Sequence, residues 1–205
     1  MKQAVAAVPN RRASRQAGRA RLTSAESLGR TGLDLFIKYG FDNVTVEDIS
    51  EAAGIGRRTF FRYFSSKNDL PWGDFDGLLL RMRSRLAEVP AETPLFDALR
   101  ESVVDFNRFP EDEIPFLRQR MMVLLTTPTL VAHSALRYQD WRKVVAEFVA
   151  ERLGVAWHSH IAITLGQVCL GISLSAYEEW LVDETLLLGE LIDGGFHNVR
   201  AVFAG

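Results

Sequence analysis

Residues 45–70 read TVEDISEAAGIGRRTFFRYFSSKNDL, and this stretch decides the fold of the chain. It holds two short helical patterns separated by Gly54, and it ends in a cluster of arginines and aromatic residues. Thr45 can cap the first helix, whose first turn carries Glu47 and Asp48. Gly54 suits the left-handed conformation that often ends a helix. This order of signals predicts a helix-turn-helix, a motif whose second helix enters the major groove of DNA.

The second helix of this motif is expected to present a basic and aromatic surface. One side of its helical wheel carries Arg57, Arg58, Phe61 and Arg62. Phe60 falls on the opposite side. Arginine side chains match guanine edges or phosphates, and an aromatic ring or the Thr59 methyl group can contact thymine methyl groups. The alternative is a solvated basic face on an ordinary helical domain, which the ordered run of signals disfavours.

The same segment resembles the DNA-binding domain of the TetR family of bacterial repressors. The resemblance rests on the acidic first helix and on Ala52-Ala53-Gly54, Thr59-Phe60, Tyr63-Phe64, Ser66-Lys67 and Leu70. It implies that Thr59, Phe61 and Tyr63 face the DNA backbone or groove. It also implies that Lys67 opens a fourth helix and contacts a phosphate.

The chain departs from the family pattern at Phe61, where tyrosine is most common. A hydrogen bond from a phenol to a phosphate is therefore missing, and Arg57 and Arg58 can replace that contact electrostatically while also reading bases. The DNA-binding residues expected from the sequence are Thr45, Gly56, Arg57, Arg58, Thr59, Phe61, Arg62, Tyr63 and Lys67.

The charge of the chain is unevenly distributed. Residues 1–69 carry 12 Lys and Arg against 7 Asp and Glu, whereas the remainder carries 12 against 19. A basic N-terminal third fits the neutralisation of phosphates, and an acidic remainder should avoid DNA. Over 205 residues we expect a flexible basic arm (1–21), a helix-turn-helix domain (22–67), and a helical effector-binding and dimerisation domain (68–205).

The single cysteine, Cys169, excludes an intramolecular disulfide framework and fits a reducing cytoplasm. Its apolar surroundings favour a buried side chain over a redox sensor. No apolar run reads as long and clean enough to span a membrane, and the N-terminus lacks an apolar signal core. We therefore expect a cytoplasmic protein without a membrane partner.

The connections around the motif carry helix signals of their own. The arginines of the arm can add phosphate contacts or serve only as a solubilising tail, and both interpretations stay open. Thr23 and Glu26 form a possible capping box for a first helix that ends near Tyr39. The segment Ser66-Lys67-Asn68 is expected to start a connecting helix, with Pro71 in its first turn or at a kink.

Beyond Pro90 every pattern reads as helical, so we expect an all-α, TetR-like fold. The predicted helices span 93–108, 111–125, 127–153, 157–182 and 184–203. The last two have apolar sides that can pair with the same helices of a second copy in a four-helix homodimer interface, unless both are internal. These sides consist of Ile161, Leu165, Val168, Ile172 and Tyr177, and of Leu186, Leu187, Ile192, Phe196, Val199 and Phe203.

A narrower resemblance extends from the helix-turn-helix to about Leu181. It rests on PWGDFD (71–76), FNRFP (106–110), AHSALRYQDWR (132–142) and AYEEWL (176–181). These strings are similar to the TetR-type regulators found with mycofactocin biosynthesis genes in actinobacteria. The resemblance implies control of a redox-peptide cofactor pathway. It also makes acyl-coenzyme A thioesters a reasonable class of effector, because several TetR-type regulators of lipid metabolism sense them.

The region after the motif is rich in large side chains that can line an apolar pocket or simply form core. His133, Arg137 and Trp141 share one helix face by their four-residue spacing. Arg120 or Arg137 can meet the phosphate or carboxylate of an anionic effector, or can pair with protein carboxylates. The candidate effector-binding residues are Trp72, Phe75, Phe106, Arg120, Met121, His133, Arg137, Tyr138 and Trp141.

Other kinds of site are not supported by the sequence. His158 and His160 lie two residues apart and face different ways on a helix, so we expect no metal, and we expect no cofactor. No nucleophile–base set or phosphate-binding loop is visible. The leading interpretation is a repressor released from a palindromic DNA operator by a small-molecule effector. The alternatives are an activator of the same fold, a helical-bundle enzyme acting on a lipid-like substrate, and a nonspecific DNA-coating protein.

Overall fold

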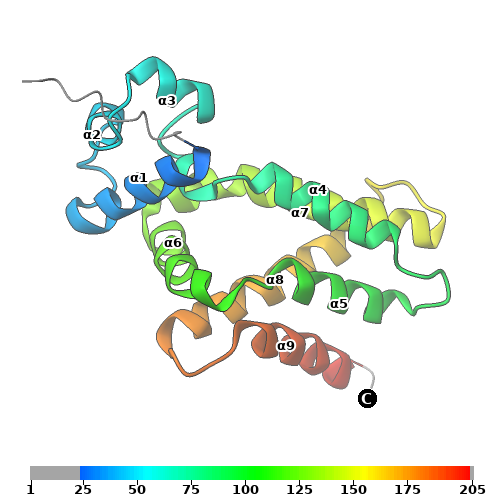
Figure 1. Cartoon of the computed structure of the whole chain (residues 1–205). Coiled ribbons are helices and arrows are strands. Elements are labelled where there is room, and N and C mark those ends of the chain that lie inside the picture. Colours follow the sequence, from blue (N-terminus) through cyan, green and yellow to red (C-terminus); the bar gives the residue numbers. More distant parts are fainter. Residues whose placement is uncertain (1–23, 204–205) are drawn as a thin grey trace, which may run out of the picture.

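The structure is a computed structural model that describes residues 24–203 (Figure 1). Within this range it consists of α-helices, two 3₁₀ helices and connecting turns, and it contains no strand. The all-helical expectation is confirmed. The N-terminal helices are α1 (Ala25–Tyr39), α2 (Val46–Ala52) and α3 (Arg57–Tyr63), followed by the 3₁₀ helix η1 (Leu70–Trp72). The remaining elements are α4 (Phe75–Ala87), α5 (Leu95–Phe106), η2 (Glu111–Glu113), α6 (Ile114–Thr126), α7 (Pro128–Leu153), α8 (His160–Val182) and α9 (Leu188–Phe203).

Helix ends follow local chemistry, and most expected ends are close to the observed ones. α7 begins at Pro128 and ends at Gly154, which adopts the left-handed conformation (φ 66°), as expected. The predicted cap of α1 is wrong: Ser24 and Ser27 form the capping box, while Thr23 lies outside the described residues. α8 and α9 begin later than expected, at His160 and Leu188, because turns occupy the preceding residues.

The expected connecting helix from Ser66 is also wrong. Residues 65–69 form turns, and η1 with Pro71 in its first positions follows them. Gly73 then adopts a positive φ of 57°, and α4 starts only after Asp74, whose side chain accepts a hydrogen bond from the Gly77 N–H. Proline and the Gly73 turn prevent a continuous helix here, so the link between the recognition helix and α4 is a compact turn rather than a rod.

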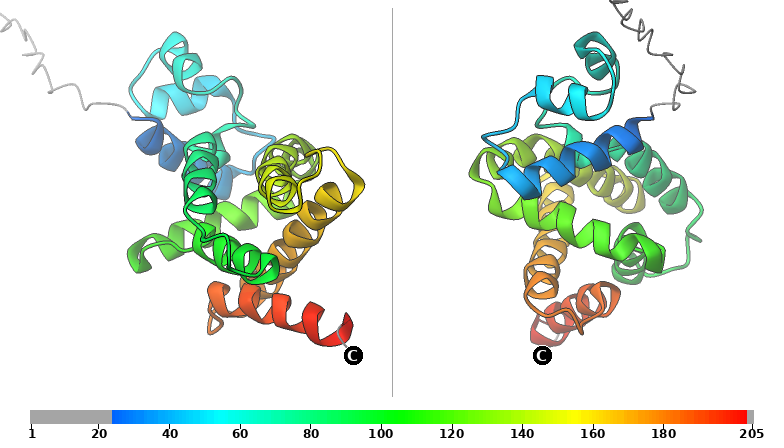
Figure 2. Two further views of the ribbon diagram at one scale, coloured as in Figure 1. Left: turned by 90° about the vertical axis from the view of Figure 1, so that its right-hand side faces the viewer. Right: turned by 60° about the vertical axis from the view of Figure 1, so that its left-hand side comes forward.

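The helix-turn-helix lies at one end of the molecule and α9 at the other (Figures 1 and 2). α7 packs along α8 and α8 along α9, while α4 lies beside α7 and α5 beside α9. α1 contacts both α6 and η1 and so joins the two ends. One continuous buried cluster extends from Leu28 in α1 to Phe196 in α9. The elements that position DNA contacts therefore share a core with the elements of the larger helical region.

α8 requires a correction to the sequence interpretation. By length and composition alone it is apolar enough to cross a membrane, and it is the one such helix among the described residues. In the fold it packs against α7 and α9, and Cys169 is among its buried residues. Burial raises the pKa of the Cys169 thiol to about 12, so this cysteine is an inert core side chain at neutral pH.

Candidate DNA interface and effector cavity

Thr45 caps the start of α2 and Gly54 lies in the turn between α2 and α3, as expected. The Thr45 hydroxyl accepts a hydrogen bond from the Asp48 N–H, and the Asp48 carboxylate accepts one from the Thr45 N–H (2.8 Å). The Thr45 hydroxyl and the Thr45 N–H therefore both donate to the Asp48 carboxylate. These hydrogen bonds lower the pKa of Asp48. Gly54 has a φ of 67°, where a side chain would be strained. Thr45 therefore serves α2, and neither of its donors is free for a phosphate.

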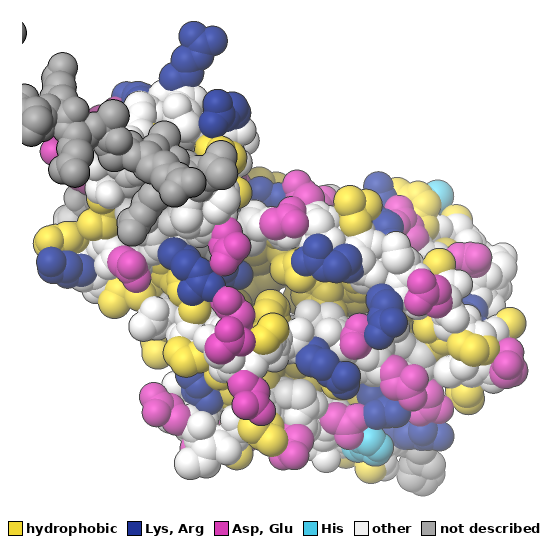
Figure 3. Space-filling view, in the orientation of Figure 1, with side chains coloured by type: hydrophobic (Ala, Val, Ile, Leu, Met, Phe, Trp, Pro, Cys, Tyr) yellow, Lys and Arg dark blue, Asp and Glu magenta, His cyan; other side chains and the backbone are white. Residues whose placement is uncertain are grey.

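α3 separates an anchoring face from an exposed face. Phe60 is fully buried, whereas its neighbour Phe61 is 43% exposed. Arg57 pairs with Glu47 and stacks over Phe61, while Arg62 lies against the Tyr63 ring. Arg58 is exposed and has no ion-pair partner among the described residues. Figure 3 shows Lys and Arg side chains projecting from the end of the molecule that carries α3.

Lys67 is the expected DNA contact whose surroundings differ most from the prediction. It does not open a helix: its ammonium group donates hydrogen bonds to the carbonyls of Phe41 and Val44 (2.8 Å each) and lies 4.3 Å from the centre of the Phe41 ring. These contacts fasten the turn after α3 to the loop that precedes α2. At most one N–H of Lys67 is left for a phosphate.

Replacing Lys67 by methionine should destabilise the helix-turn-helix. Hydrogen bonds from a charged donor contribute about 1.5–3 kcal/mol. The Lys67→Met side chain removes the ammonium donor from both carbonyls, of which that of Phe41 keeps the hydrogen bond from the Val44 N–H (3.3 Å). Urea unfolding followed by circular dichroism measures this loss. Lys38→Met is the matched control, because exposed Lys38 lies over the Tyr39 ring and its ammonium group has no hydrogen bond or ion pair with residues 24–203. Equal stability of the two variants would contradict this role of Lys67.

A polar cluster joins the turn before η1 to α7. The Asp69 carboxylate accepts hydrogen bonds from Ser66 Oγ (2.9 Å) and Arg137 Nη2 (3.1 Å), and His133 Nε2 lies 3.0 Å from it. Arg137 also bonds Asp76 (3.2 Å). Burial alone would raise the pKa of Asp69, but the hydrogen bonds from His133, Ser66 and Arg137 lower it overall. His133 and Arg137 thus contact protein carboxylates, the alternative left open for Arg137, and their role in effector binding stays a prediction.

An apolar cavity lies between the C-terminal helices and η1. Its volume is about 80 Å³, and in the view of Figure 3 the surface is hollowed over apolar side chains in this central region. It is lined by seven of the nine expected effector residues: Trp72, Phe75, Phe106, Arg120, Met121, Tyr138 and Trp141. Their binding role stays a prediction, but the structure brings these side chains together.

The polar groups of the cavity are few and mostly neutral. Tyr177 donates a hydrogen bond to Asn107 (2.8 Å). Burial raises the pKa of both Tyr138 and Tyr177, so both phenols are protonated at neutral pH. Burial lowers the pKa of the Arg120 guanidinium, and the nearby charge of Arg30 lowers it further. An arginine nevertheless stays protonated in proteins. Arg120 is thus the charged group among the described residues that line this cavity.

The sequence interpretation missed the contribution of α8 to the cavity. Leu170, Ser173, Leu174 and Tyr177 line it. The helical period of α8 was visible, but Tyr177 was assigned to the same side as Ile161 and Val168. In the structure Tyr177 is buried while Ile161 and Val168 are exposed. A helix with apolar residues on several sides does not reveal which side faces inward.

These features together define a class of protein. An all-helical chain with a helix-turn-helix at one end and an apolar cavity among the helices behind it has the layout of a ligand-responsive transcriptional regulator. Comparison with known proteins then identifies the family: the chain belongs to the TetR family. Residues 30–70 match the bacterial regulatory proteins of the tetR family, and residues 93–204 match the MftR C-terminal domain.

Similar proteins agree with this assignment. The chain is 43% identical over 184 residues to the protein described as mycofactocin biosynthesis transcriptional regulator MftR in Mycobacterium tuberculosis, covering 90% of this chain and 93% of that protein. A TetR-family regulator from Syntrophomonas wolfei has a similar fold (TM-score 0.63, 17% identity, 88% of this chain and 95% of that one). So does the repressor FadR of Thermus thermophilus in complex with lauroyl-CoA (TM-score 0.55, 18% identity, 85% and 92%). The protein is thus a TetR-family transcriptional regulator similar to MftR, a class whose members are not enzymes.

Proposed function

We propose that this protein is a cytoplasmic, homodimeric repressor of mycofactocin-related genes, released from a palindromic operator by an effector that occupies the apolar cavity. Its relative in Mycobacterium tuberculosis carries the mycofactocin assignment in its description. An activator of the same fold would use the same contacts, and a promoter fusion measured with and without the protein distinguishes the two signs of control.

The observation that carries the proposal is the construction of η1. Its first residue, Leu70, is buried in the same core as α1, where Gly32 leaves room for it: a Cβ atom on Gly32 would lie only 2.5 Å from a Leu70 methyl group. The next two residues, Pro71 and Trp72, line the cavity. Three consecutive residues therefore contact both the DNA-binding helices and the cavity. A ligand that moves Trp72 would therefore also move Leu70, which packs against Gly32 of α1.

DNA recognition is assigned to the exposed face of α3. Each subunit would place this face in one major groove, with phosphate contacts from neighbouring groups. Arg58 is the best candidate for base readout, because Arg57 is engaged by Glu47 whereas Arg58 is exposed without an ion-pair partner in the described chain. Thr59, Phe61, Arg62 and Tyr63 remain candidates on the same helix, and Gly56 caps it.

Replacing Arg58 by alanine should weaken operator binding while leaving the fold intact. The loss of one bidentate contact is worth about 1–3 kcal/mol, or roughly 5- to 150-fold in affinity. Fluorescence anisotropy with the protein's own upstream DNA and scrambled DNA at one salt concentration measures it. Arg81→Ala is the control, because Arg81 is an exposed arginine of α4, away from α3. If both variants bind like wild type, Arg58 does not contribute to readout.

The homodimer interface is assigned to α8 and α9. Exposed apolar side chains of α8 include Ile161 and Val168, and Leu187 just before α9 and Val202 in its last turn are exposed as well. An exposed apolar surface on two packed helices suits pairing with the same helices of a second copy. A two-fold dimer would match a palindromic operator.

The effector is proposed to be an amphiphile with a long apolar chain, with acyl-coenzyme A thioesters as the first class to test. The similar fold of FadR from Thermus thermophilus binds lauroyl-CoA. The cavity of about 80 Å³ is smaller than the roughly 300–1,000 Å³ typical of ligand sites. Binding of the effector would therefore favour a conformation with an expanded cavity. Repression ends if, in that conformation, the distance between the two α3 helices of the dimer no longer matches the operator.

An anisotropy titration tests this function directly. The protein should bind its upstream DNA more tightly than scrambled DNA, and lauroyl-coenzyme A should reverse the binding. If the protein binds its upstream DNA selectively and no acyl thioester reverses this binding, the protein is still a DNA-binding regulator, but acyl thioesters are not its effectors. Equal affinity for the upstream DNA and the scrambled DNA would contradict the proposal that the upstream DNA contains the operator.

A further inference from the structure

Three polar groups of the cavity wall lack acceptors among the described residues. Trp72 Nε1–H and the Tyr138 hydroxyl are buried there without a hydrogen-bond partner. Arg120 is partly buried, and within the described chain it stacks over the Phe116 ring (4.7 Å to the centre) but has no ion pair. Trp72 and Arg120 can only donate. Because buried donors without acceptors are costly, their presence in one cavity indicates a ligand group rich in acceptors.

Arg120 also lies at the boundary of a second cavity. This junction cavity, of about 180 Å³, is lined by residues of α1, η1 and α6, including Gly29, Phe116 and Arg120. Pro71 and Arg120 line both cavities. A ligand whose chain fills the apolar cavity would therefore reach the contact between α1 and α6 with its end.

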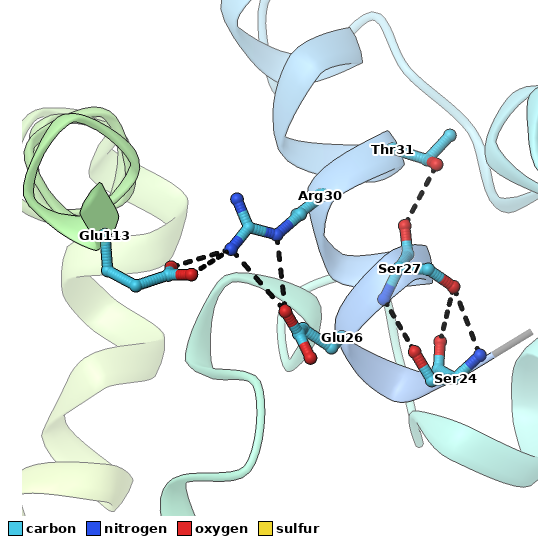
Figure 4. Close-up of polar contacts among 6 residues, drawn as sticks. All are labelled: Ser24, Glu26, Ser27, Arg30, Thr31 and Glu113. Atoms are coloured by element: carbon cyan, nitrogen blue, oxygen red, sulfur yellow. Dashed lines mark hydrogen bonds and ion pairs between the residues drawn. The ribbon is translucent and has the colours of Figure 1, made fainter. Parts of the chain in front are cut away.

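The junction is held by an ion pair that Figure 4 shows. Arg30 of α1 donates from Nη2 to both oxygens of Glu113 (2.6 and 2.7 Å) in η2, and Glu26 lies 3.5 Å from its Nε. Arg30 also stacks on Phe116, at 4.2 Å from the ring centre. Arg30 and Arg120 therefore both lie against Phe116, one from the DNA-binding helices and one from α6.

We propose that the effector carries an anionic, acceptor-rich head which binds Arg120, where the two cavities meet, together with the Trp72 N–H of the apolar cavity, and which competes with Glu113 for Arg30. The proposal rests on the effector cavity proposed above. It adds that the head of the ligand, rather than its apolar chain, breaks the contact between Arg30 and Glu113. Carboxylate and phosphate heads share the required chemistry, because both accept hydrogen bonds from guanidinium groups.

The charges around the junction explain why binding would be competitive. Arg30 and Arg120 are faced by the carboxylates of Glu26 and Glu113, and Asp74 lines the junction cavity as well. An added anion must therefore displace a carboxylate. Glu113 is the partner whose loss matters, since it lies in η2, whereas Glu26 belongs to the same helix as Arg30. Its displacement removes the ion pair between α1 and η2 and so loosens the support of the helix-turn-helix.

Calorimetric titration of the full-length protein with three ligands of equal chain length tests the head group. The ligands are laurate, lauroyl-coenzyme A and neutral 1-dodecanol. Wild type should bind at least one of the anions about tenfold or more tightly than dodecanol. Tighter binding of laurate would identify a carboxylate as the head. Tighter binding of lauroyl-coenzyme A would identify the thioester and phosphates of coenzyme A as the head. Arg120→Met should weaken anion binding about 10- to 100-fold and leave dodecanol binding nearly unchanged.

Arg81→Met serves as the matched control, because Arg81 lines a neighbouring groove between α4 and α5 rather than the cavity. If Arg81→Met loses the preference for anions while Arg120→Met keeps it, the head lies in that groove and the proposal is overturned. Equal binding of dodecanol and both anions to wild type overturns the head-group site alone. No binding of any of the three ligands overturns the effector class as well.

The competition with Glu113 has its own test. Glu113→Gln should strengthen binding of the preferred anion about two- to fivefold, the range expected for release of one exposed ion pair, without changing dodecanol binding. It should lower the concentration of that anion needed to release DNA in the same proportion. Glu111→Gln in the same η2 turn is the control, since Glu111 is exposed and outside the Arg30 contact. Identical anion affinity in both variants would overturn the competition.

Discussion

Replacing Val168 by glutamate should convert the protein into monomers and nearly abolish operator binding. Val168 is 38% exposed on the face of α8 that also presents Ile161. In the proposed four-helix interface this change would bury a carboxylate from each subunit without a partner, which is strongly unfavourable. A monomer engages one half-site, and the loss of bivalent binding costs about 10²- to 10⁴-fold in affinity. Sedimentation velocity and operator anisotropy measure the two effects.

Leu80→Glu is the control for this experiment. Leu80 is 64% exposed on α4, so its replacement adds the same charge and removes a similar apolar surface away from α8 and α9. It should remain dimeric and bind DNA normally. A Val168→Glu protein that sediments as a dimer with unchanged affinity would place the interface elsewhere on the surface.

The sequence was sufficient for features that depend on short-range chemistry. The Thr45 cap, the Gly54 turn and the start of α7 at Pro128 involve residues within a few positions of one another, and each was predicted. The inward position of Phe60 followed from helical spacing in the same way. Resemblance to a known family added the overall arrangement, which no local pattern contains.

What the sequence could not provide were contacts between distant segments. Lys67 bonds carbonyls more than 20 positions earlier, and His133 and Arg137 meet Asp69 more than 60 positions earlier. The spacing of His133 and Arg137 correctly placed them on one helix face but could not say what that face meets. The same limit applies to Arg30 and Glu113, whose 83-residue separation hides the junction between α1 and η2.

These long-range contacts also suggest how regulation is distributed. Polar contacts tie the DNA-binding helices to the C-terminal region, and they include Arg30–Glu113 and Asp69–Arg137. In addition, η1 connects the core of α1 to the cavity. Asp69–Arg137 is mostly buried, whereas the half-exposed Arg30–Glu113 pair contributes little by itself. A ligand of modest differential affinity can therefore shift the orientation of the helix-turn-helix without unfolding it.

Phe60→Ala should unfold the helix-turn-helix while leaving the C-terminal helices folded. α3 has only seven residues, too few for a stable isolated helix, so it depends on the packing of its anchoring residue. Phe60 is fully buried and packs against Phe64, with 5.8 Å between ring centres. Removing a buried Phe side chain costs about 3–5 kcal/mol, which exceeds the stability expected for so small a unit.

Hydrogen exchange and operator anisotropy together decide this prediction. Amides of α2 and α3 should exchange rapidly in Phe60→Ala, those of α8 should stay protected, and operator binding should be lost. Phe61→Ala is the matched variant, because it removes the same ring from the next, 43% exposed position. It should keep native protection and weaken only DNA binding. Equal destabilisation by both variants would show that burial of Phe60 does not hold α3 in place.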